Sequence, residues 1–240
     1  MRVKAVIAYD GSAYHGFQRQ TSTENTITTA IEKALRNLHI ASKIVGSGRT
    51  DAGVHAVGQV IHFDLPPFWS DLGKLKAALN RNLDTVQFKH ICSVPDDFHA
   101  RFSAKKRVYR YLFKQEKPSL FEQRYIAHYT HFDPVRLRDA LALFEGEHNF
   151  IHFYKTGSQT HTTLRKIYRT DYKIYGKYHA LYFTANGFLR SQVRMMVEAA
   201  MRCAQDVLTI TQLQEQLEGN KRHTTRPAPS EGLYLARILY

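Results

Sequence analysis

The chain has 240 residues, of which 43% are hydrophobic and 12% aromatic, enough to bury the core of one large domain or two modest ones. Its apolar runs are shorter than the roughly 20 residues that span a bilayer, and the first is too short for a signal peptide. We therefore expect a cytoplasmic protein without a membrane segment. The net charge of +13, from 34 Lys and Arg against 21 Asp and Glu, favours a polyanionic partner such as nucleic acid.

Hydrophobic periodicity predicts alternating strands and helices along the first half of the chain. The expected order is strand, helix, strand, helix, strand, at residues 3–10, 27–38, 57–63, 70–83 and 86–94. Val3, Ala5 and Ile7 share one side of the first strand, as the two-residue period requires. Ser70 or Asp71 is placed to cap the second helix.

The second half continues the alternation and adds a hairpin. The expected order is strand, helix, two strands, two helices and strand, at residues 107–113, 133–146, 162–176, 178–185, 189–206, 209–219 and 232–240. The helix over 133–146 begins with Asp133 as its cap and Pro134 in its first turn. Gly176 and Lys177 between two strand patterns predict a hairpin turn. The pattern predicts an α+β fold, with helices against a mainly antiparallel sheet.

A glycine-bracketed turn precedes the strand at 57–63. Gly46, Gly48 and Gly53 permit a sharp, closely approached backbone around Arg49 and Asp51. An acid and a base on a tight loop at the mouth of a strand are typical of a working site. The same pair is equally typical of a structural contact that closes a turn, and these residues alone leave both interpretations open.

The segment from Arg101 to Lys117 concentrates the positive charge. Its cations are Arg101, Lys105, Lys106, Arg107, Arg110, Lys114 and Lys117, against the single acid Glu116. Its interleaved aromatic residues are Phe102, Tyr109, Tyr111 and Phe113. Cations that meet phosphates, beside flat rings that stack on bases, favour a nucleic-acid surface. The alternative is a solvated basic strand whose other face fills the core.

The sequence does not predict a metal site. Cys92 and Cys203 lie far apart and match no metal-binding pair. His148 and His152 are four residues apart, but their surroundings are typical of a strand and supply no carboxylate or cysteine partner.

Four stretches together resemble tRNA pseudouridine synthases of the TruA type, in the order that this family shows. They are "YDGSAYHGFQRQ" at 9–20, "GSGRTDAGVHAVGQVIHFD" at 46–64, "VPDDFHARFSAKKRVYRYLF" at 94–113 and "PAPSEGLYLARILY" at 227–240. The block "GRTDAGVHA" is highly specific to the family.

The resemblance implies two α/β domains, which we expect at 1–104 and 105–240, whose sheets run together into a shared, mainly antiparallel sheet flanked by helices around a basic cleft. It also implies a homodimer, a reaction without metal or organic cofactor, and pseudouridine formation at positions 38 to 40 in the anticodon arm of tRNA. Recognition there would rest mainly on shape and backbone.

The resemblance also assigns roles to individual residues. Asp51 matches the catalytic aspartate and acts as nucleophile or as base, and both roles require an ionised carboxylate. Arg194, in "FLRSQVR", is expected to pair with Asp51 and keep it ionised. Tyr109 matches the tyrosine that contacts the flipped uracil.

Further residues are expected to hold the RNA. Arg49 would contact phosphate or displace the target nucleotide, Gly48 would let the RNA backbone approach, and Leu233 would line the base pocket. The cations expected along the RNA backbone are Arg101, Lys105, Lys106, Arg107 and Arg110.

Two departures from the family pattern bear on substrate range. "FLRSQVR" replaces the usual "FLHHMVR", and "HNFIHF" at 148–153 replaces the usual "DFTSF". A divergent copy with another RNA target, or a non-catalytic RNA-binding or chaperone module, is therefore an alternative. A nucleoside hydrolase is a weaker one, since glycoside hydrolysis generally uses two carboxylates.

Overall fold

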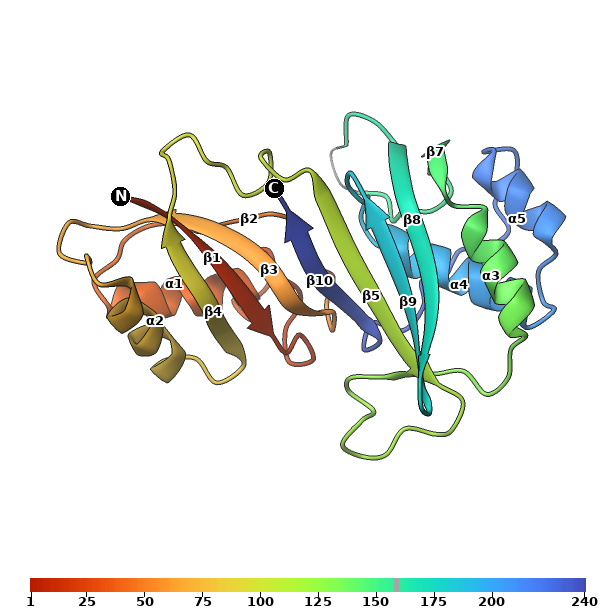
Figure 1. Ribbon diagram of the computed structural model, residues 1–240, viewed down its shortest axis with the longest axis horizontal. Helices are drawn as coiled ribbons and strands as arrows, with labels where there is room; N and C mark the ends of the chain where they lie inside the picture. The colour runs from red at the N-terminus through yellow and green to blue at the C-terminus, as the bar shows by residue number, and fades with distance from the viewer. Residues whose placement is uncertain (158–159) are drawn as a thin grey trace. The chain divides into compact units, whose positions relative to one another are not determined.

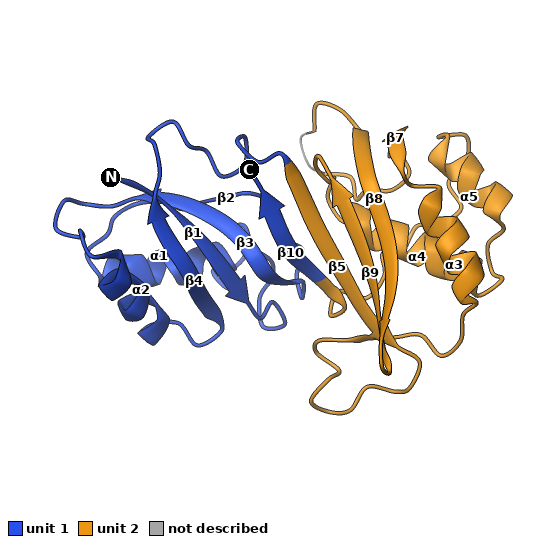
Figure 2. Cartoon of the chain, viewed as in Figure 1, with its two compact units in different colours: residues 1–105, 234–240 blue, residues 106–233 orange. Residues whose placement is uncertain are grey.

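The computed structural model describes residues 1–157 and 160–240, which form two compact units (Figure 2). Unit 1 comprises residues 1–105 and 234–240, and unit 2 comprises residues 106–233. The expected domains, 1–104 and 105–240, follow chain order, whereas the units place the last strand with the N-terminal part. Hydrophobic periodicity does not reveal that the C-terminal strand belongs with the N-terminal residues, because strand pairing links residues far apart in sequence.

Unit 1 is a mainly antiparallel sheet with helices packed on it (Figure 1). Its elements are β1 (Arg2–Tyr9), α1 (Ile27–Asn37), β2 (Val45–Gly46), β3 (His55–Asp64), α2 (Leu72–Arg81), β4 (Val86–Ser93) and β10 (Leu233–Leu239). The strands follow the order β4-β1-β3-β10, with β2 beside β3. Only the β3–β10 pairing is parallel among these described pairs.

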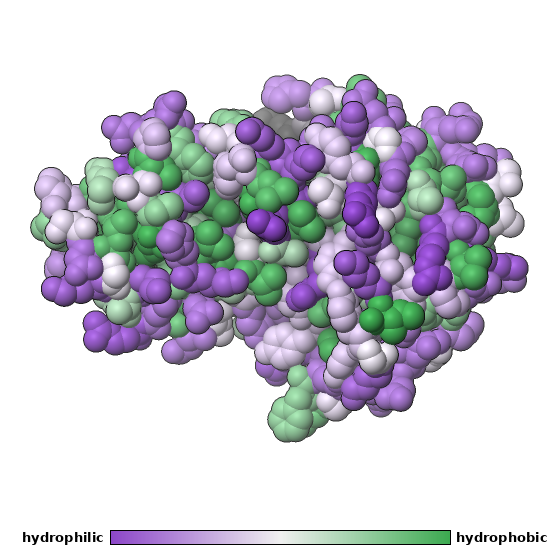
Figure 3. All heavy atoms as spheres, viewed as in Figure 1, coloured by the Kyte–Doolittle hydropathy of each residue, from purple (hydrophilic) through white to green (hydrophobic). Residues whose placement is uncertain are grey.

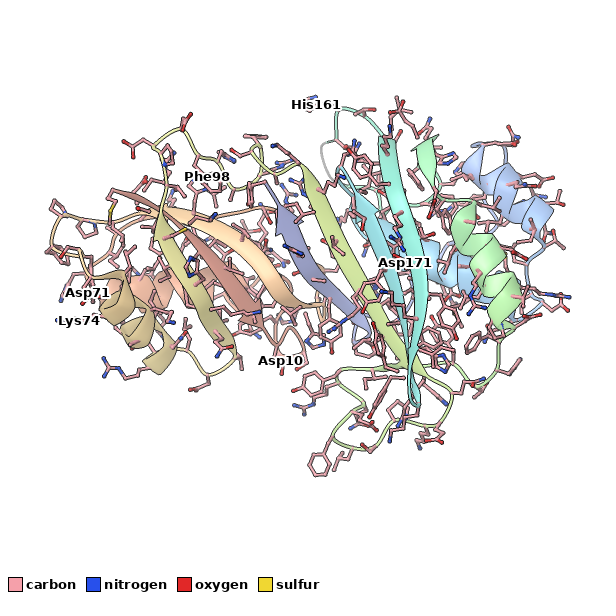
Figure 4. All side chains as sticks on the ribbon, in the orientation of Figure 1. Asp10, Asp71, Lys74, Phe98, His161 and Asp171 are labelled. Carbon is pink, nitrogen blue, oxygen red and sulfur yellow. The ribbon has the colours of Figure 1, made fainter. Side chains whose placement is uncertain are left out.

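The predicted strands and helices of unit 1 are confirmed. Val3, Ala5 and Ile7 of β1 are fully buried and alternate with partly exposed neighbours, as a strand with one face on helices requires. Asp71, rather than Ser70, caps α2, because its Oδ1 accepts a hydrogen bond of 2.9 Å from the Lys74 backbone nitrogen (Figure 4).

β3 is buried along both faces, so the polar residues within it are interior. Gln59 is fully buried and His62 is 5% exposed. A Cβ at Gly58 would lie 2.2 Å from the Ala236 carbonyl oxygen, so only glycine lets β10 run alongside β3 here.

Unit 2 is built on the antiparallel order β5-β9-β8-β7, with β6 parallel to β5. Its elements are β5 (Lys106–Lys114), β6 (Ala127–His128), α3 (Pro134–Ala142), β7 (Gly146–Asn149), β8 (Leu164–Tyr175), β9 (Tyr178–Ala185), α4 (Gln192–Ala204) and α5 (Ile210–Leu217). The hairpin turn lies at Gly176–Lys177 as predicted, with Gly176 at φ +58°.

Among the helices of unit 2, α3 begins at its predicted cap but ends early, and α4 is shorter at both ends than the expected 189–206. The Asp133 carboxylate accepts hydrogen bonds from Val135 and Arg136 at the start of α3. This helix ends at Ala142, whereas the glycine pattern placed its end at Gly146, which instead begins β7 at φ +105°. The strands of two to four residues, β2, β6 and β7, were not predicted because they are too short to show a period.

The α+β class is therefore confirmed for this chain. On the face seen in Figure 3, hydrophilic residues dominate the surface of each unit, and apolar residues show among them over the strands. Among the helices of the described residues, none is long and apolar enough to cross a membrane.

Candidate active site

Asp51 lies on the loop between β2 and β3, and buried neighbours fix the backbone around it. The Thr50 hydroxyl is hydrogen bonded to the buried Tyr9 hydroxyl at 2.8 Å, and the Thr50 carbonyl accepts from the Phe17 backbone nitrogen at 3.1 Å. Burial raises the pKa of Tyr9, so this phenol stays neutral. Arg49 is exposed and Asp51 is half-buried, so the charged side chains face outward from an anchored backbone.

A buried glutamine holds the other end of this loop. The Ser47 hydroxyl donates to Gln59 Oε1 at 2.7 Å, and Gln59 Nε2 donates to the Gly48 carbonyl at 2.8 Å. Because every one of these polar atoms has its partner, a glutamine is tolerated in the interior of β3. A Cβ at Gly48 would meet no heavy atom within 4 Å, so the outer side of the loop is open at this residue.

The stretches "YDG…GFQRQ" and "GRTDAGVHA" form one local structure. The Gly11 backbone nitrogen donates to His55 Nδ1 at 3.1 Å, and a Cβ at Gly11 would lie 2.0 Å from the Val54 carbonyl oxygen. Gly16, at φ +110°, also approaches the loop closely, with a Cβ position 2.8 Å from the Thr50 carbonyl oxygen. The glycines of the first stretch thus permit the second to close over it.

His55, Gln59 and Tyr9 support the loop but were not singled out from the sequence. A histidine and a glutamine inside an apolar strand are the signal that could have identified them. Buried polar side chains need partners, and the neighbouring loop supplies backbone groups that need partners too. Asp10, at the end of β1 (Figure 4), turns the chain there by accepting from the Ser12 backbone nitrogen at 2.9 Å.

Tyr109 lies on β5 in unit 2 and is 8% exposed. Its ring meets the ring of Phe188 edge to face, with centroids 5.1 Å apart. Its neighbour on the same face, Tyr111, is fully buried and donates to the Pro229 carbonyl at 3.1 Å. The contact of Tyr109 with a flipped uracil stays a prediction.

Arg194 lies in the first turn of α4, in contact with the segment before β10. Its Nε donates to the Ala228 carbonyl at 2.6 Å, and its own carbonyl accepts from the Ala228 backbone nitrogen at 3.0 Å. These reciprocal bonds fix the stem of the guanidinium on the helix. Leu233, expected in the base pocket, is 5% exposed.

The two departures from the family pattern leave the interior of unit 2 intact. In "FLRSQVR", the buried Gln192 side chain accepts from the Leu189 backbone nitrogen at 2.8 Å and so shapes the entry to α4. In "HNFIHF", the retained Phe150 and Phe153 are fully buried, whereas Ile151 between them is exposed.

His148 and His152 contact backbone rather than a candidate metal site. The two Nε2 atoms lie 2.8 Å from the Glu145 carbonyl and 3.1 Å from the Gly219 carbonyl respectively. Within residues 1–157 and 160–240, no group of three or more His, Cys, Asp and Glu side chains is arranged to hold a metal ion.

The cations of the basic segment 101–117 differ in exposure, because the strand β5 runs through the segment. Arg101, Lys105 and Lys106, at the start of the segment, are exposed, and Arg107 and Arg110 are half-buried. Arg107 donates to the Asn186 carbonyl at 2.7 Å.

Lys114 does not share the exposure of the other cations. It is 3% exposed, and its Nζ lies 2.7 Å from Glu122 Oε2. At least one cation of the sequence pattern, Lys114, is therefore too buried to contact a phosphate.

The predicted site residues divide between the two units. Asp51, Arg49 and Gly48 belong to unit 1, and Tyr109, Arg194 and Leu233 belong to unit 2. Their roles remain predictions from the family resemblance.

Comparison with known proteins identifies the family. The family model described as "tRNA pseudouridine synthase" matches residues 5–103 and 140–240, most of the chain and both units. The chain belongs to this family, and it is an RNA-modifying isomerase that forms pseudouridine in tRNA.

Relatives named tRNA pseudouridine synthase A align over nearly the whole chain. Those of Wolinella succinogenes and Helicobacter hepaticus are each 38% identical, over 98% and 99% of this chain and 93% and 98% of their own. That of Lactococcus lactis is 36% identical over all of this chain and 97% of its own. A chain in the crystal structure of a Cbf5-Nop10-Gar1 complex covers 81% of this chain and 44% of its own at 14% identity, and its TM-score of 0.36 is too low to carry an argument.

Proposed function

We propose that this enzyme converts uridine to pseudouridine at positions 38 to 40 in the anticodon arm of tRNA, with Asp51 as the catalytic carboxylate. The observation that carries the proposal is the construction of the Asp51 loop. Its neighbours Ser47 and Thr50 are buried and hydrogen bonded, whereas Asp51 itself keeps contact with solvent. A loop anchored in this way holds a reactive carboxylate in place before the substrate arrives.

The reaction breaks the bond between the uracil nitrogen and the ribose and forms a carbon–carbon bond between the same two groups. It is an isomerisation, so its atoms balance without a second substrate. An ionised Asp51 serves either as a nucleophile or as a base that removes a sugar proton while the glycosidic bond breaks. In either role, exclusion of water by the RNA would raise the carboxylate pKa, and a nearby cation opposes that rise.

Arg194 is the residue that we assign to this electrostatic role. Its Nε is occupied by the Ala228 carbonyl, at 2.6 Å, which orients the guanidinium plane. A planar guanidinium pairs well with a carboxylate. We assign uracil contact to Tyr109 and Leu233, and phosphate contact or displacement of the target nucleotide to Arg49.

The remaining assignments concern the RNA surface and the assembly. We assign backbone contacts to Arg101, Lys105, Lys106, Arg107 and Arg110, none of which is buried. Gly48 has open space where a side chain would be, which suits close approach of an RNA strand. We further propose that the enzyme works in the cytoplasm as a homodimer, as the family resemblance implies.

The test uses unmodified tRNA transcripts with uridine at position 38, 39 or 40, without added metal or cofactor. Carbodiimide labelling and reverse transcription map the pseudouridine formed. Wild-type protein should give stops at these positions, and Asp51→Asn should reduce turnover by at least about 10³-fold with tRNA affinity and melting temperature unchanged.

Asp71→Asn is the matched control for this experiment. Asp71 is an exposed acid that caps α2, so its variant should lose at most about 1 kcal/mol of stability and keep full turnover. Full activity of Asp51→Asn would remove Asp51 from the mechanism. Stops elsewhere in the transcripts, or tRNA binding without any stops, would favour another RNA target or a non-catalytic binding module respectively.

A further inference from the structure

Phe102 is the one aromatic residue of the basic segment 101–117 that the described structure leaves exposed. The sequence pattern offered four rings among the cations. Tyr109, Tyr111 and Phe113 are at most 8% exposed, whereas Phe102 is 75% exposed. It lies in unit 1, on the loop that follows β4 and also carries Phe98 (Figure 4).

The turn that presents Phe102 is tightly built. Consecutive backbone nitrogens along residues 99–103 all donate to named acceptors: His99 to Ser103 Oγ, Ala100 to His62 Nδ1, Arg101 and Phe102 to His99 Nδ1, and Ser103 to the His99 carbonyl, at 2.9–3.2 Å. The Ala100 carbonyl in turn accepts from the Tyr240 hydroxyl at 2.7 Å. A turn with this many hydrogen bonds fixes the backbone that carries the exposed ring.

The ring is also supported from behind. The His99 imidazole stacks on Phe102 with centroids 4.3 Å apart and planes at 29°, and the centroid of the buried His62 ring lies 5.0 Å from that of His99. The Arg101 guanidinium lies 5.5 Å from the centre of the Phe102 ring. Phe102 thus ends a series of flat groups that begins in the interior of unit 1.

A second exposed phenylalanine of the same unit shows what an unsupported ring looks like. Phe68 is 64% exposed, and the ring of Trp69 lies tilted to it with centroids 6.5 Å apart. The nearby charged residue in the chain is the acid Asp71. Phe102 instead has Arg101 beside it and Lys105 three residues on. Exposure alone therefore does not distinguish Phe102, but its support and its charge do.

We propose that Phe102 is a stacking platform for an unpaired base of the tRNA substrate, a base other than the isomerised uridine, with Arg101 and Lys105 at the adjoining phosphates. The proposal rests on the proposed function for its substrate. Single-stranded and loop bases are held in proteins by stacking on aromatic rings and guanidinium planes, with cations along the backbone. The Phe102 ring has one face against an imidazole and most of its surface in water, so it can stack with a base without rearrangement.

The first experiment places a fluorophore at the platform. Trp69 is the only tryptophan of the chain, so Phe102→Trp in a Trp69→Phe background carries a single emitter at position 102. Unmodified tRNA transcript should quench this emission on binding, because a base stacks on the indole. A blunt RNA duplex without unpaired bases should bind through its phosphates without comparable quenching.

The matched control is the Trp69→Phe background with Phe68→Trp, which should show little quenching by the same tRNA. If tRNA binds, as seen by gel mobility shift, and the emission from position 102 is unchanged, Phe102 is not a platform. Quenching by the duplex to the same extent would likewise overturn base stacking.

The second experiment separates this proposal from the proposed function. Phe102→Ala should raise the KM for tRNA about tenfold and leave kcat unchanged, and Phe68→Ala should change neither. Phe102→Trp should restore the KM, because it keeps an aromatic face. A fall in kcat with KM unchanged would contradict the platform. If tRNA quenches the indole at position 102 while the wild-type protein forms no pseudouridine, the proposed function is overturned and the platform stands.

Discussion

The Asp51 loop and the basic segment 101–117 present charged residues to solvent by opposite means. In the loop, the Ser47 and Thr50 hydroxyls and the Gly48 carbonyl are hydrogen bonded to buried side chains, and the backbone anchored in this way directs the charged side chains toward solvent. In the segment, the backbone is ordinary strand along β5, and alternation decides side chain by side chain what is exposed.

This difference predicts how the two regions respond to substitution. A change beneath the loop should move the backbone and disturb every residue on it together. A change in the segment should affect one side chain only, and its consequence should depend on whether that side chain is exposed or buried. Stability and RNA binding should therefore separate cleanly in the segment and fail together when the substitution lies beneath the loop.

The largest effect is expected from Gly11→Ala, beneath the loop. The new Cβ would lie 2.0 Å from the Val54 carbonyl oxygen, which is backbone and cannot rotate away. We expect a loss of about 3 kcal/mol, seen as a fall of about 10 °C in melting temperature, together with lost turnover.

Gly48→Ala is the matched variant on the outer side of the same loop. Its Cβ would meet no heavy atom of the protein within 4 Å, so the melting temperature should stay within about 1 °C of wild type. If RNA approaches this backbone, affinity for tRNA should nevertheless fall. Equal destabilisation by the two substitutions would show that the loop is not anchored from the inner side.

The sequence predicted the loop well and the basic segment only in part, for a physical reason. Gly46, Gly48 and Gly53 and the residues between them form a local motif, so their spacing alone defines a sharp turn. The composition of the segment does not say which face of β5 is covered, because residues from elsewhere in the chain cover it. Tyr111 and Phe113 therefore became core residues, and Phe102, outside the strand, did not.

Supporting contacts from distant residues were the least predictable. His55 accepts a hydrogen bond from the Gly11 backbone nitrogen, 44 residues away in sequence. His62 accepts one from the Ala100 backbone nitrogen, 38 residues away. Periodicity marks both histidines only as polar positions in an apolar strand. Which backbone group each one satisfies depends on tertiary packing.

An intermediate effect is expected in the basic segment, where Lys105 and Lys114 form a matched pair. Lys105→Ala removes a cation that is open to solvent, so tRNA affinity should fall several-fold and the slope of log K against log salt should flatten by about 0.9. The melting temperature should not change.

Lys114→Met should give the reverse pattern. Hydrogen bonds hold the pKa of the Glu122 carboxyl well below its usual range. The bond from Lys114 has the largest effect, followed by those from the Tyr178 hydroxyl and the Ser119 backbone nitrogen. Removing the buried cation should lower the melting temperature and leave the salt slope unchanged. A flattened salt slope for Lys114→Met would mean that this lysine meets phosphate after all.

The smallest effect is expected from the protonation of His62, which makes the stability of the fold depend on pH. Burial, then the positive charges of His99 and Arg2, lower its pKa below the ordinary value of 6.5, and the Asp64 carboxylate opposes them. The unfolded chain therefore binds a proton that the folded chain does not, so stability present above pH 6.5 is lost as the pH falls from 6.5 toward the lowered pKa. Protonation at Nδ1 would also remove the acceptor for the Ala100 backbone nitrogen.

His62→Asn isolates this contribution, because an asparagine oxygen can accept the same hydrogen bond and does not titrate. Between about pH 7 and pH 5 the melting temperature of wild type should fall by a few degrees more than that of His62→Asn. The lowered pKa of His179, which burial causes in unit 2, is common to both proteins and cancels in the difference. Parallel curves for the two proteins would show that His62 is not protonated on unfolding in this range.

Because the turn at 99–103 depends on the hydrogen bond from the Ala100 backbone nitrogen to residue 62, quenching of the indole in Phe102→Trp by tRNA should weaken over the same pH interval when residue 62 is histidine. It should persist when residue 62 is asparagine.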